Sequence, residues 1–144
     1  MITRGMPIDD LDTPVQVVDL NKLEWNIRTM QEAVSAGGAR LRPHVKTHKI
    51  PEIARMQQAA GGHGIAVAKV AEAEVFARAG FTDIVVAYPV VGPEKWRRLA
   101  ELARTCRVTV NLESEFAARG LSEAAAAAGV TVLVQIDVDT GFRR

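Results

Sequence analysis

Strand-like apolar segments recur along this chain at a nearly constant interval, and a helix-like segment fills each gap between them. The predicted strands begin near residues 41, 65, 84, 108 and 131, which lie roughly 20–25 residues apart. Parallel strands need a crossover of about a dozen residues or more, usually a helix, whereas antiparallel hairpins need only a short turn. The spacing therefore predicts an α/β fold with a parallel sheet and right-handed crossovers.

Capping residues mark where the helices begin and end. Asp19 is expected to cap a helix over residues 21–36, which carries apolar residues at three- and four-residue steps. Ser114 is expected to cap a helix that ends at Gly129. The remaining local predictions are a short strand over residues 15–20 and helices that begin at Pro51, Ala71 and Pro93.

The last predicted strand, residues 130–139, distinguishes two parallel-sheet architectures. One of its faces is apolar, whereas the other carries Gln135, Asp137 and Asp139. A strand inside an open doubly wound sheet should be apolar on both faces, but the inner face of a barrel strand turns polar at its C-terminal end. We therefore expect a partial (β/α)₈ TIM-type barrel of about five barrel strands. Because a complete barrel has about 250 residues, residues 1–144 are expected to be a truncated N-terminal part of one.

Residues 40–50 are strongly basic and are predicted to form the first barrel strand. Lys46 is the best nucleophile in this segment, since desolvation and neighbouring cations favour a neutral amine. His44 shares its face, and both are expected to meet Gln135, Asp137 and Asp139 across one cavity. The same residues also fit a solvated basic strand end or a structural polar network. Strand alternation places Leu41, Pro43, Val45 and Thr47 on the packed face and Arg42, His44, Lys46 and His48 on the other.

Bulk composition narrows the class of partner. The chain is 48% hydrophobic and 24% charged with a formal net charge of +1, so it offers no footprint for nucleic acid. No apolar run reaches the roughly 20 residues of a membrane span, and the N-terminus lacks a signal-peptide core. Cys106 is the only cysteine and cannot form an internal disulfide. These features predict a cytoplasmic protein that binds neither nucleic acid nor a membrane.

Two segments resemble a known enzyme family. Residues 42–49, Arg-Pro-His-Val-Lys-Thr-His-Lys, resemble the cofactor-lysine segment of the D-threonine aldolase and D-serine dehydratase family, which are fold-type III pyridoxal-phosphate enzymes related to alanine racemase. Residues 138–144 resemble the Val-Asp-Thr-Gly-x-x-Arg segment of alanine racemases. The resemblance implies that Lys46 carries pyridoxal 5′-phosphate as a Schiff base and that Arg144 hydrogen-bonds the phenolic oxygen. His44, Gln135 and Asp137 are further cofactor-binding candidates.

The same resemblance implies a lyase that acts on D-3-hydroxy amino acids. Retro-aldol cleavage, as in D-threonine aldolase, gives glycine and an aldehyde, whereas D-serine dehydration gives pyruvate and ammonia. The motifs also fit a racemase, a non-catalytic pyridoxal-phosphate-binding protein, or a fragment that is inactive alone. Racemisation usually needs a tyrosine on the opposite cofactor face, and the only tyrosine, Tyr88, lies on a predicted strand. The family's C-terminal β-domain, with its ligands for Mn or Zn, is expected to be absent here, and relatives are usually homodimers.

Overall fold

The structure is a computed structural model that describes residues 4–141. Its strands are β1 (Ile65–Val67), β2 (Asp83–Pro89), β3 (Arg107–Leu112) and β4 (Leu133–Ile136). Its α-helices are α1 (Leu20–Ala36), α2 (Pro51–Ala59), α3 (Val70–Arg78), α4 (Pro93–Leu102) and α5 (Glu115–Ala128), and two 3-10 turns are η1 (Ile8–Asp10) and η2 (Val45–Thr47).

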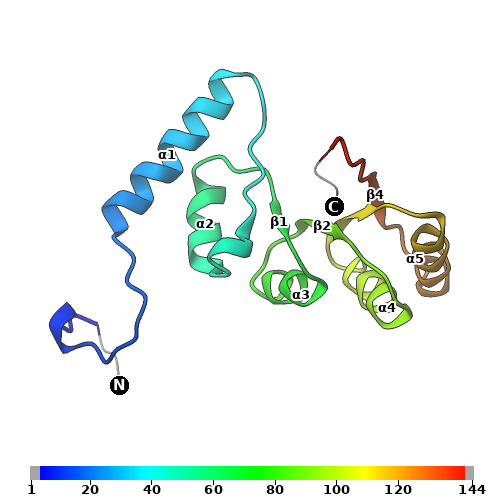
Figure 1. Ribbon diagram of the computed structural model, residues 1–144, viewed down its shortest axis with the longest axis horizontal. Helices are drawn as coiled ribbons and strands as arrows, with labels where there is room; N and C mark the ends of the chain where they lie inside the picture. Colours follow the sequence, from blue (N-terminus) through cyan, green and yellow to red (C-terminus); the bar gives the residue numbers. More distant parts are fainter. Residues whose placement is uncertain (1–3, 142–144) are drawn as a thin grey trace.

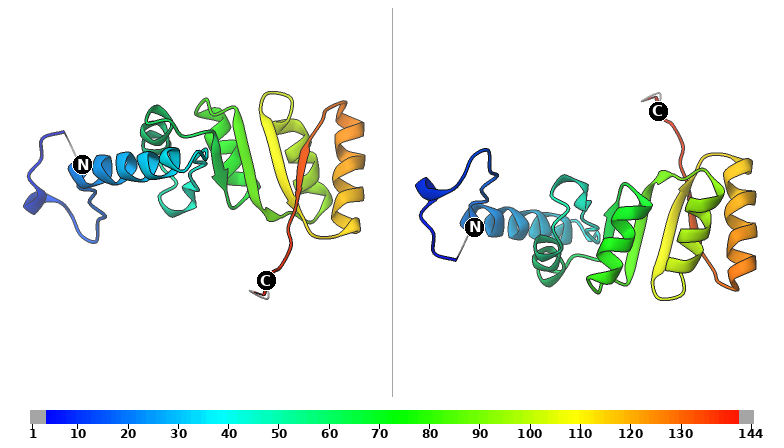
Figure 2. Two further views of the ribbon diagram at one scale, coloured as in Figure 1. Left: turned by 90° about the horizontal axis from the view of Figure 1, so that it is seen from above. Right: turned by 90° about the horizontal axis from the view of Figure 1, so that it is seen from below.

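The four strands form one parallel sheet in the order β1-β2-β3-β4, so each strand pairs with its neighbour in the sequence. Helices α3, α4 and α5 lie along the same side of this sheet (Figure 1). Seen from above, the strands lie side by side in front of those helices, and seen from below the helices lie in front of the strands (Figure 2). A doubly wound sheet would carry helices on both faces. The arrangement therefore confirms the predicted partial barrel.

The core lies between the sheet and these helices. Every second strand residue faces it, and Val67, Val86 and Val110 are fully buried. Phe76 of α3 and Leu99 of α4 cover these valines from the helical side. The opposite face of the sheet, which becomes the lumen in a closed barrel, carries Ala66, Val85 and Thr109. This core fixes the carboxyl ends of β1, β2 and β3 at one edge of the molecule.

The predicted helix signals are confirmed by the hydrogen bonds at the helix ends. The Asp19 carboxylate accepts from the Lys22 N–H at 3.1 Å, and the Ser114 hydroxyl accepts from the Ala117 N–H at 3.2 Å. Gly129 adopts the left-handed conformation with φ of 66° after α5. A glycine there avoids the Cβ penalty, which explains why α5 ends at this residue.

The predicted strand over residues 40–50 is wrong. Only His44 makes a β-bridge, with Ala66 of β1, and the chain then turns through η2. Pro43 has no N–H to donate to a ladder. Beyond it, local hydrogen bonds replace strand pairing, because the Lys46 N–H donates to His44 Nδ1 and the Lys49 N–H donates to the Val45 carbonyl.

The alternation predicted for this segment holds only near the bridge. Pro43 and Val45 are buried as expected, but Thr47 is exposed. Arg42 lies at the opposite end of the sheet, where it contacts Asp83. The predicted strand over residues 15–20 is also wrong, since this exposed segment has no strand partner among residues 4–141.

Candidate functional site

Two hollows lie next to each other where the parallel strands end. The first, which we call the Lys46 hollow, has a volume of about 770 Å³. The second, the acidic hollow, has a volume of about 660 Å³. Both are lined by residues 87–89 at the end of β2, which separate them. Their position at the carboxyl ends of the strands is the position of active sites in (β/α)₈ barrels.

Lys46 is held on a single turn that is anchored from both sides. Val45, its neighbour, is fully buried in the core. The Lys46 N–H donates to His44 Nδ1 at 3.3 Å, and η2 closes when the Lys49 N–H donates to the Val45 carbonyl at 2.8 Å. The Lys46 side chain is exposed and lines the Lys46 hollow. The backbone of this lysine is therefore fixed while its amine stays accessible.

His44 supports this turn as a neutral imidazole. Partial burial, and after it the positive charge of Lys46, lower the pKa of His44 below its ordinary value of 6.5. Because Nδ1 accepts the backbone N–H of Lys46, the proton of the neutral ring lies on Nε2. That assignment leaves Nε2 as a hydrogen-bond donor beside the Lys46 hollow, of which His44 is a lining residue.

Glu72 connects the Lys46 turn to the main fold. Its side chain is 11% exposed, and one oxygen lies 3.3 Å from Lys49 Nζ. The other oxygen accepts from the Ala68 N–H, just after β1, at 2.8 Å. Burial favours a raised pKa for Glu72, but the Ala68 N–H and Lys49 outweigh it and hold the pKa below its ordinary value. The ionised carboxylate of Glu72 therefore links α3 to the segments that follow η2 and β1.

Lys49, the partner of Glu72, adopts a left-handed backbone conformation. Its φ is 56°, and among residues 4–141 it is the one non-glycine residue with a positive φ. A left-handed conformation costs a residue with a Cβ about 1–2 kcal/mol. The ion pair with Glu72 and the hydrogen bond to Val45 offset this cost. Strain of this kind, when it is retained, commonly lies next to functional residues.

The other predicted site residues lie away from Lys46. Gln135 pairs in register with Asn111 on the open face of the sheet and is exposed, and it lines neither hollow. Asp137 lines the acidic hollow, where its carboxylate accepts from Asn111 Nδ2 at 3.4 Å. The structure thus places Asp137 in the hollow beside that of Lys46. Arg144 lies outside the described residues.

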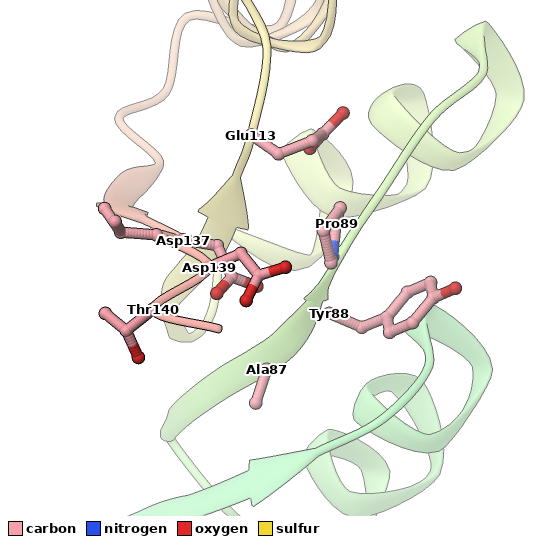
Figure 3. Close-up of a pocket in the computed structure, with 8 residues that line it drawn as sticks. Ala87, Tyr88, Pro89, Glu113, Asp137, Asp139 and Thr140 are labelled. Atoms are coloured by element: carbon pink, nitrogen blue, oxygen red, sulfur yellow. The ribbon is translucent and has the colours of Figure 1, made fainter. Parts of the chain in front are cut away.

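The acidic hollow gathers carboxylates at the ends of β3 and β4. Glu113, Asp137 and Asp139 line it, and no basic side chain of the described chain does. Figure 3 shows the Tyr88 ring pointing away from the carboxyl groups of Asp137 and Asp139. Tyr88 lines the Lys46 hollow as well. Tyr88 therefore lies at the boundary between the Lys46 hollow, which is basic, and the acidic hollow.

The prediction from sequence missed several residues that line the Lys46 hollow. Lys69 precedes α3, Lys95 lies in the first turn of α4, and Tyr88 is near the end of β2. All three share a feature that the sequence shows, because each lies at or after the end of a predicted strand, where the active sites of parallel barrels are found. Reading the residues after every strand, as well as the strand faces, would have identified them.

The histidines do not gather into a metal site. His48 lies between α1 and α2, where its Nδ1 accepts from the Ile50 N–H, and His63 lies 3.8 Å from Asp83. Within residues 4–141, no group of three or more His, Cys, Asp or Glu side chains is arranged to hold a metal ion. Nor does that part of the chain contain a helix long and apolar enough to cross a membrane.

Comparison with known proteins matches residues 18–144 to the alanine racemase N-terminal domain. A D-threonine aldolase from Arthrobacter sp is 41% identical over 140 residues, covering 97% of this chain and 37% of the relative. A D-threo-3-hydroxyaspartate dehydratase from Delftia sp. (strain HT23) is 39% identical over 134 residues, covering 93% of this chain and 35% of the relative. The crystal structure of D-threonine aldolase from Filomicrobium marinum matches 95% of this chain and 37% of its own length at 41% identity, with a TM-score of 0.93.

These matches confirm the resemblance expected from residues 42–49 and 138–144. The chain spans little more than a third of the length of the relatives that it matches. The family match, by contrast, covers most of the 144 residues of this chain. The protein therefore belongs to the family defined by the alanine racemase N-terminal domain.

Proposed function

We propose that this chain carries the cofactor-holding lysine of a pyridoxal-phosphate-dependent lyase that acts on D-3-hydroxy amino acids. The reaction that we favour is retro-aldol cleavage of the D-threonine aldolase type. The observation that carries the proposal is the placement of Lys46, whose anchored backbone and exposed amine lie at the carboxyl edge of the partial barrel. The similarity to a D-threonine aldolase at 41% identity supports the choice of reaction.

The residues around Lys46 fit pyridoxal phosphate chemically. The cofactor has an aldehyde, an aromatic ring and a phosphate. The Lys46 hollow offers a primary amine, the ring of Tyr88 and further cationic side chains within about 770 Å³. Lys46 would hold the aldehyde carbon, and the positive charge around it suits a ligand that bears a phosphate. We assign Arg144 to the phenolic oxygen by its place in the motif alone.

The chain's own residues position the reactive amine. His44 fixes the Lys46 backbone through Nδ1, and the Glu72–Lys49 pair fixes the far side of the turn to β1. The neutral state of His44 avoids a second full charge directly beside the Lys46 amine. When bound, the cofactor draws electrons from the bonds at the substrate α-carbon, which makes cleavage there feasible. We propose supporting cofactor contacts for Gln135 and Asp137 in the closed barrel.

Dehydration is a second candidate, because the D-threo-3-hydroxyaspartate dehydratase is nearly as similar to this chain as the aldolase is. Both reactions need a lysine-held cofactor and a substrate with a 3-hydroxyl group. Retro-aldol cleavage breaks the bond between Cα and Cβ of the substrate, whereas dehydration breaks the bond between Cβ and its hydroxyl oxygen. The described residues support both reactions equally, so analysis of the reaction products distinguishes them.

Product analysis of the full-length protein tests the proposal. With pyridoxal phosphate and D-threonine, we expect acetaldehyde and glycine in equal amounts, and no acetaldehyde from Lys46→Ala. Lys22→Ala is the matched control, since Lys22 is an exposed lysine in α1. Release of pyruvate from D-serine without aldehyde from D-threonine would favour the dehydratase. Cleavage activity that survives in Lys46→Ala would contradict the role of Lys46.

The proposal extends to properties of the full protein that lie outside this chain. We infer that residues 1–144 form the N-terminal part of a longer barrel domain followed by a β-domain, in a cytoplasmic homodimer. A divalent metal, Mn or Zn, belongs to this proposal by family resemblance. The described residues do not fit such an ion, so no step of the reaction is assigned to it.

A further inference from the structure

Two histidines flank Lys46 and hold its turn, η2, by the same kind of local hydrogen bond. His44 precedes Lys46 by two residues, and His48 follows it by two. In each case the ring Nδ1 accepts the backbone N–H of the second residue further along the chain. His44 accepts from Lys46 at 3.3 Å, and His48 accepts from Ile50 at 3.0 Å. The turn that carries Lys46 therefore has a histidine anchor on each side.

The two histidine rings line different hollows. His44 lines the Lys46 hollow, whereas His48 lines a hollow of about 380 Å³ between α1 and α2, which we call the α1–α2 hollow. The walls of the α1–α2 hollow are mainly apolar and include Val18, Leu23, Ile27, Met30, Leu41 and Ile53. A polar atom that is buried there needs a partner inside the hollow.

The α1–α2 hollow gathers polar atoms that lack such a partner. Among residues 4–141, four buried side-chain polar atoms have no hydrogen-bond partner, and three of them belong to residues that line this hollow. These three are Gln31 Oε1 of α1, His48 Nε2 and Gln57 Oε1 of α2. Buried polar groups are nearly always hydrogen-bonded, to protein or to ordered water. Three such atoms around one hollow therefore indicate a bound ligand.

The hydrogen-bonding roles of the three atoms define this ligand. Burial lowers the pKa of His48 below its ordinary 6.5, against the opposing effect of Gln57, so the ring is neutral at pH 7. Because Nδ1 accepts from Ile50, the ring proton lies on Nε2, which is a donor. The Gln31 amide nitrogen donates to the Ser35 hydroxyl at 3.0 Å, which leaves the amide oxygen as an acceptor. The ligand must accept one hydrogen bond and donate two, as water does.

We propose that a buried water molecule joins His48 Nε2 to Gln31 Oε1 and Gln57 Oε1, which makes His48 a positioning residue for the cofactor lysine. The water ties η2 to α1 through Gln31 and to α2 through Gln57. An ammonium group cannot accept from Nε2–H, and a carboxylate cannot donate to the glutamine oxygens. The role rests on the proposed function, because it concerns the lysine that holds the cofactor there. The rival arrangement is a direct hydrogen bond between His48 and Gln57.

A crystal structure of the full-length protein tests the water directly. We expect a water molecule within about 3.2 Å of His48 Nε2 and of both glutamine oxygens. A direct hydrogen bond from Nε2 to Gln57 overturns the proposal. A side chain from beyond residues 1–144 in the place of the water overturns it as well.

Glutamine variants of the full-length protein test the positioning role. Gln57→Met removes one acceptor, and Gln58→Met is the matched control, because Gln58 is exposed on the same helix. Loss of a buried hydrogen bond should speed amide exchange of residues 46–50 about two- to tenfold in Gln57→Met alone. The dissociation constant of pyridoxal phosphate, measured from its imine absorbance, should rise by a similar factor. Equal exchange in the two variants, or an unchanged dissociation constant in Gln57→Met, overturns the role.

Two substitutions of His48 separate the contributions of its ring nitrogens. His48→Gln places an amide N–H near the position of Nε2, whereas His48→Asn places an oxygen near that of Nδ1. We expect pyridoxal-phosphate affinity to fall less in His48→Gln than in His48→Asn. The reverse order assigns the effect to the Ile50 contact alone and overturns the proposal.

Amide exchange separates this inference from the proposed function, because it needs neither cofactor nor turnover. Faster exchange in Gln57→Met without an imine on Lys46 retains the water-linked turn and refutes the proposed function. An imine on Lys46 with unchanged exchange in Gln57→Met refutes the water-linked turn alone.

Discussion

Replacing Gly120 with alanine sets helix propensity against steric fit. Gly120 lies inside α5, where alanine is favoured over glycine by about 1 kcal/mol. An added Cβ, however, would lie no farther than 2.5 Å from three atoms of the Trp96 indole ring. Trp96 belongs to α4 and is 7% exposed, so its ring has little room to move away. We expect the steric effect to prevail.

The size of the destabilisation follows from the contacts that Trp96 loses when its ring moves. Its Nε1–H donates to the Val90 carbonyl at 2.8 Å in a buried position, and its ring packs edge-on against Phe116. Overpacking of a core costs about 1–3 kcal/mol, and a lost buried hydrogen bond costs about 1–3 kcal/mol. After subtraction of the propensity gain, Gly120→Ala should lower the free energy of unfolding by about 1–5 kcal/mol.

Urea unfolding followed by far-UV circular dichroism measures this change. Gly37→Ala is the matched control, because its φ is −79° and the nearest atom to an added Cβ is 3.4 Å away. It should stabilise the protein by about 0.4–1 kcal/mol. In a Trp96→Leu background, Gly120→Ala should become stabilising as well, since the ring is gone. A neutral or stabilising effect of Gly120→Ala with Trp96 intact would refute the reasoning.

Three further predictions concern charged residues. Arg42 overcomes the opposing effect of burial and holds the pKa of Asp83 below its ordinary 3.8. This stabilisation is complete above that pH and is lost as the pH falls through the lowered pKa. The midpoint of urea unfolding should therefore fall less steeply with decreasing pH in Asp83→Asn than in the wild type. Lys49→Gly should be more stable than Lys49→Ala by about 1 kcal/mol in urea unfolding, because only glycine relieves the positive φ; equal stabilities would argue against strain there. Lys46→Met should raise the pKa of His44 in an NMR titration, since the charge of Lys46 helps to lower it; no change would show that burial acts alone.

The repeated order of strands and helices was predictable because it rests on local signals. Asp19 and Ser114 cap helices wherever an extended residue precedes a helical run, and Gly129 ends one because it tolerates a positive φ. The barrel was predictable from the polar residues of the last strand. Strand ends were less so, and β4 (Leu133–Ile136) is shorter than the expected residues 130–139, since strand ends depend on partners.

The conformation around Lys46 was not predictable from alternation. Strand periodicity assumes that backbone groups pair with a neighbouring strand. Here the His44 ring accepts the Lys46 N–H, and Val45 accepts that of Lys49, so the backbone is satisfied locally. The sequence contains the histidine that makes this turn, but a histidine in a basic run also suits a strand. Only tertiary structure decides between the two conformations.

The composition of the Lys46 hollow was hidden for a different reason. Lys69 and Lys95 are single basic residues next to short loops, and such residues are usually solvated. They become neighbours of Lys46 because successive parallel strands bring their carboxyl ends to one edge. The long interval between them in the sequence conceals this relation until the sheet order is known.

The most direct measurement of the central claim identifies the lysine that bears the cofactor. The full-length protein is loaded with pyridoxal phosphate, reduced with borohydride, digested and mapped by mass spectrometry. We predict the cofactor mass on Lys46, and no labelled peptide from Lys46→Ala. Label on Lys49 or Lys69 in the wild type, or undiminished labelling of Lys46→Ala, would contradict the account.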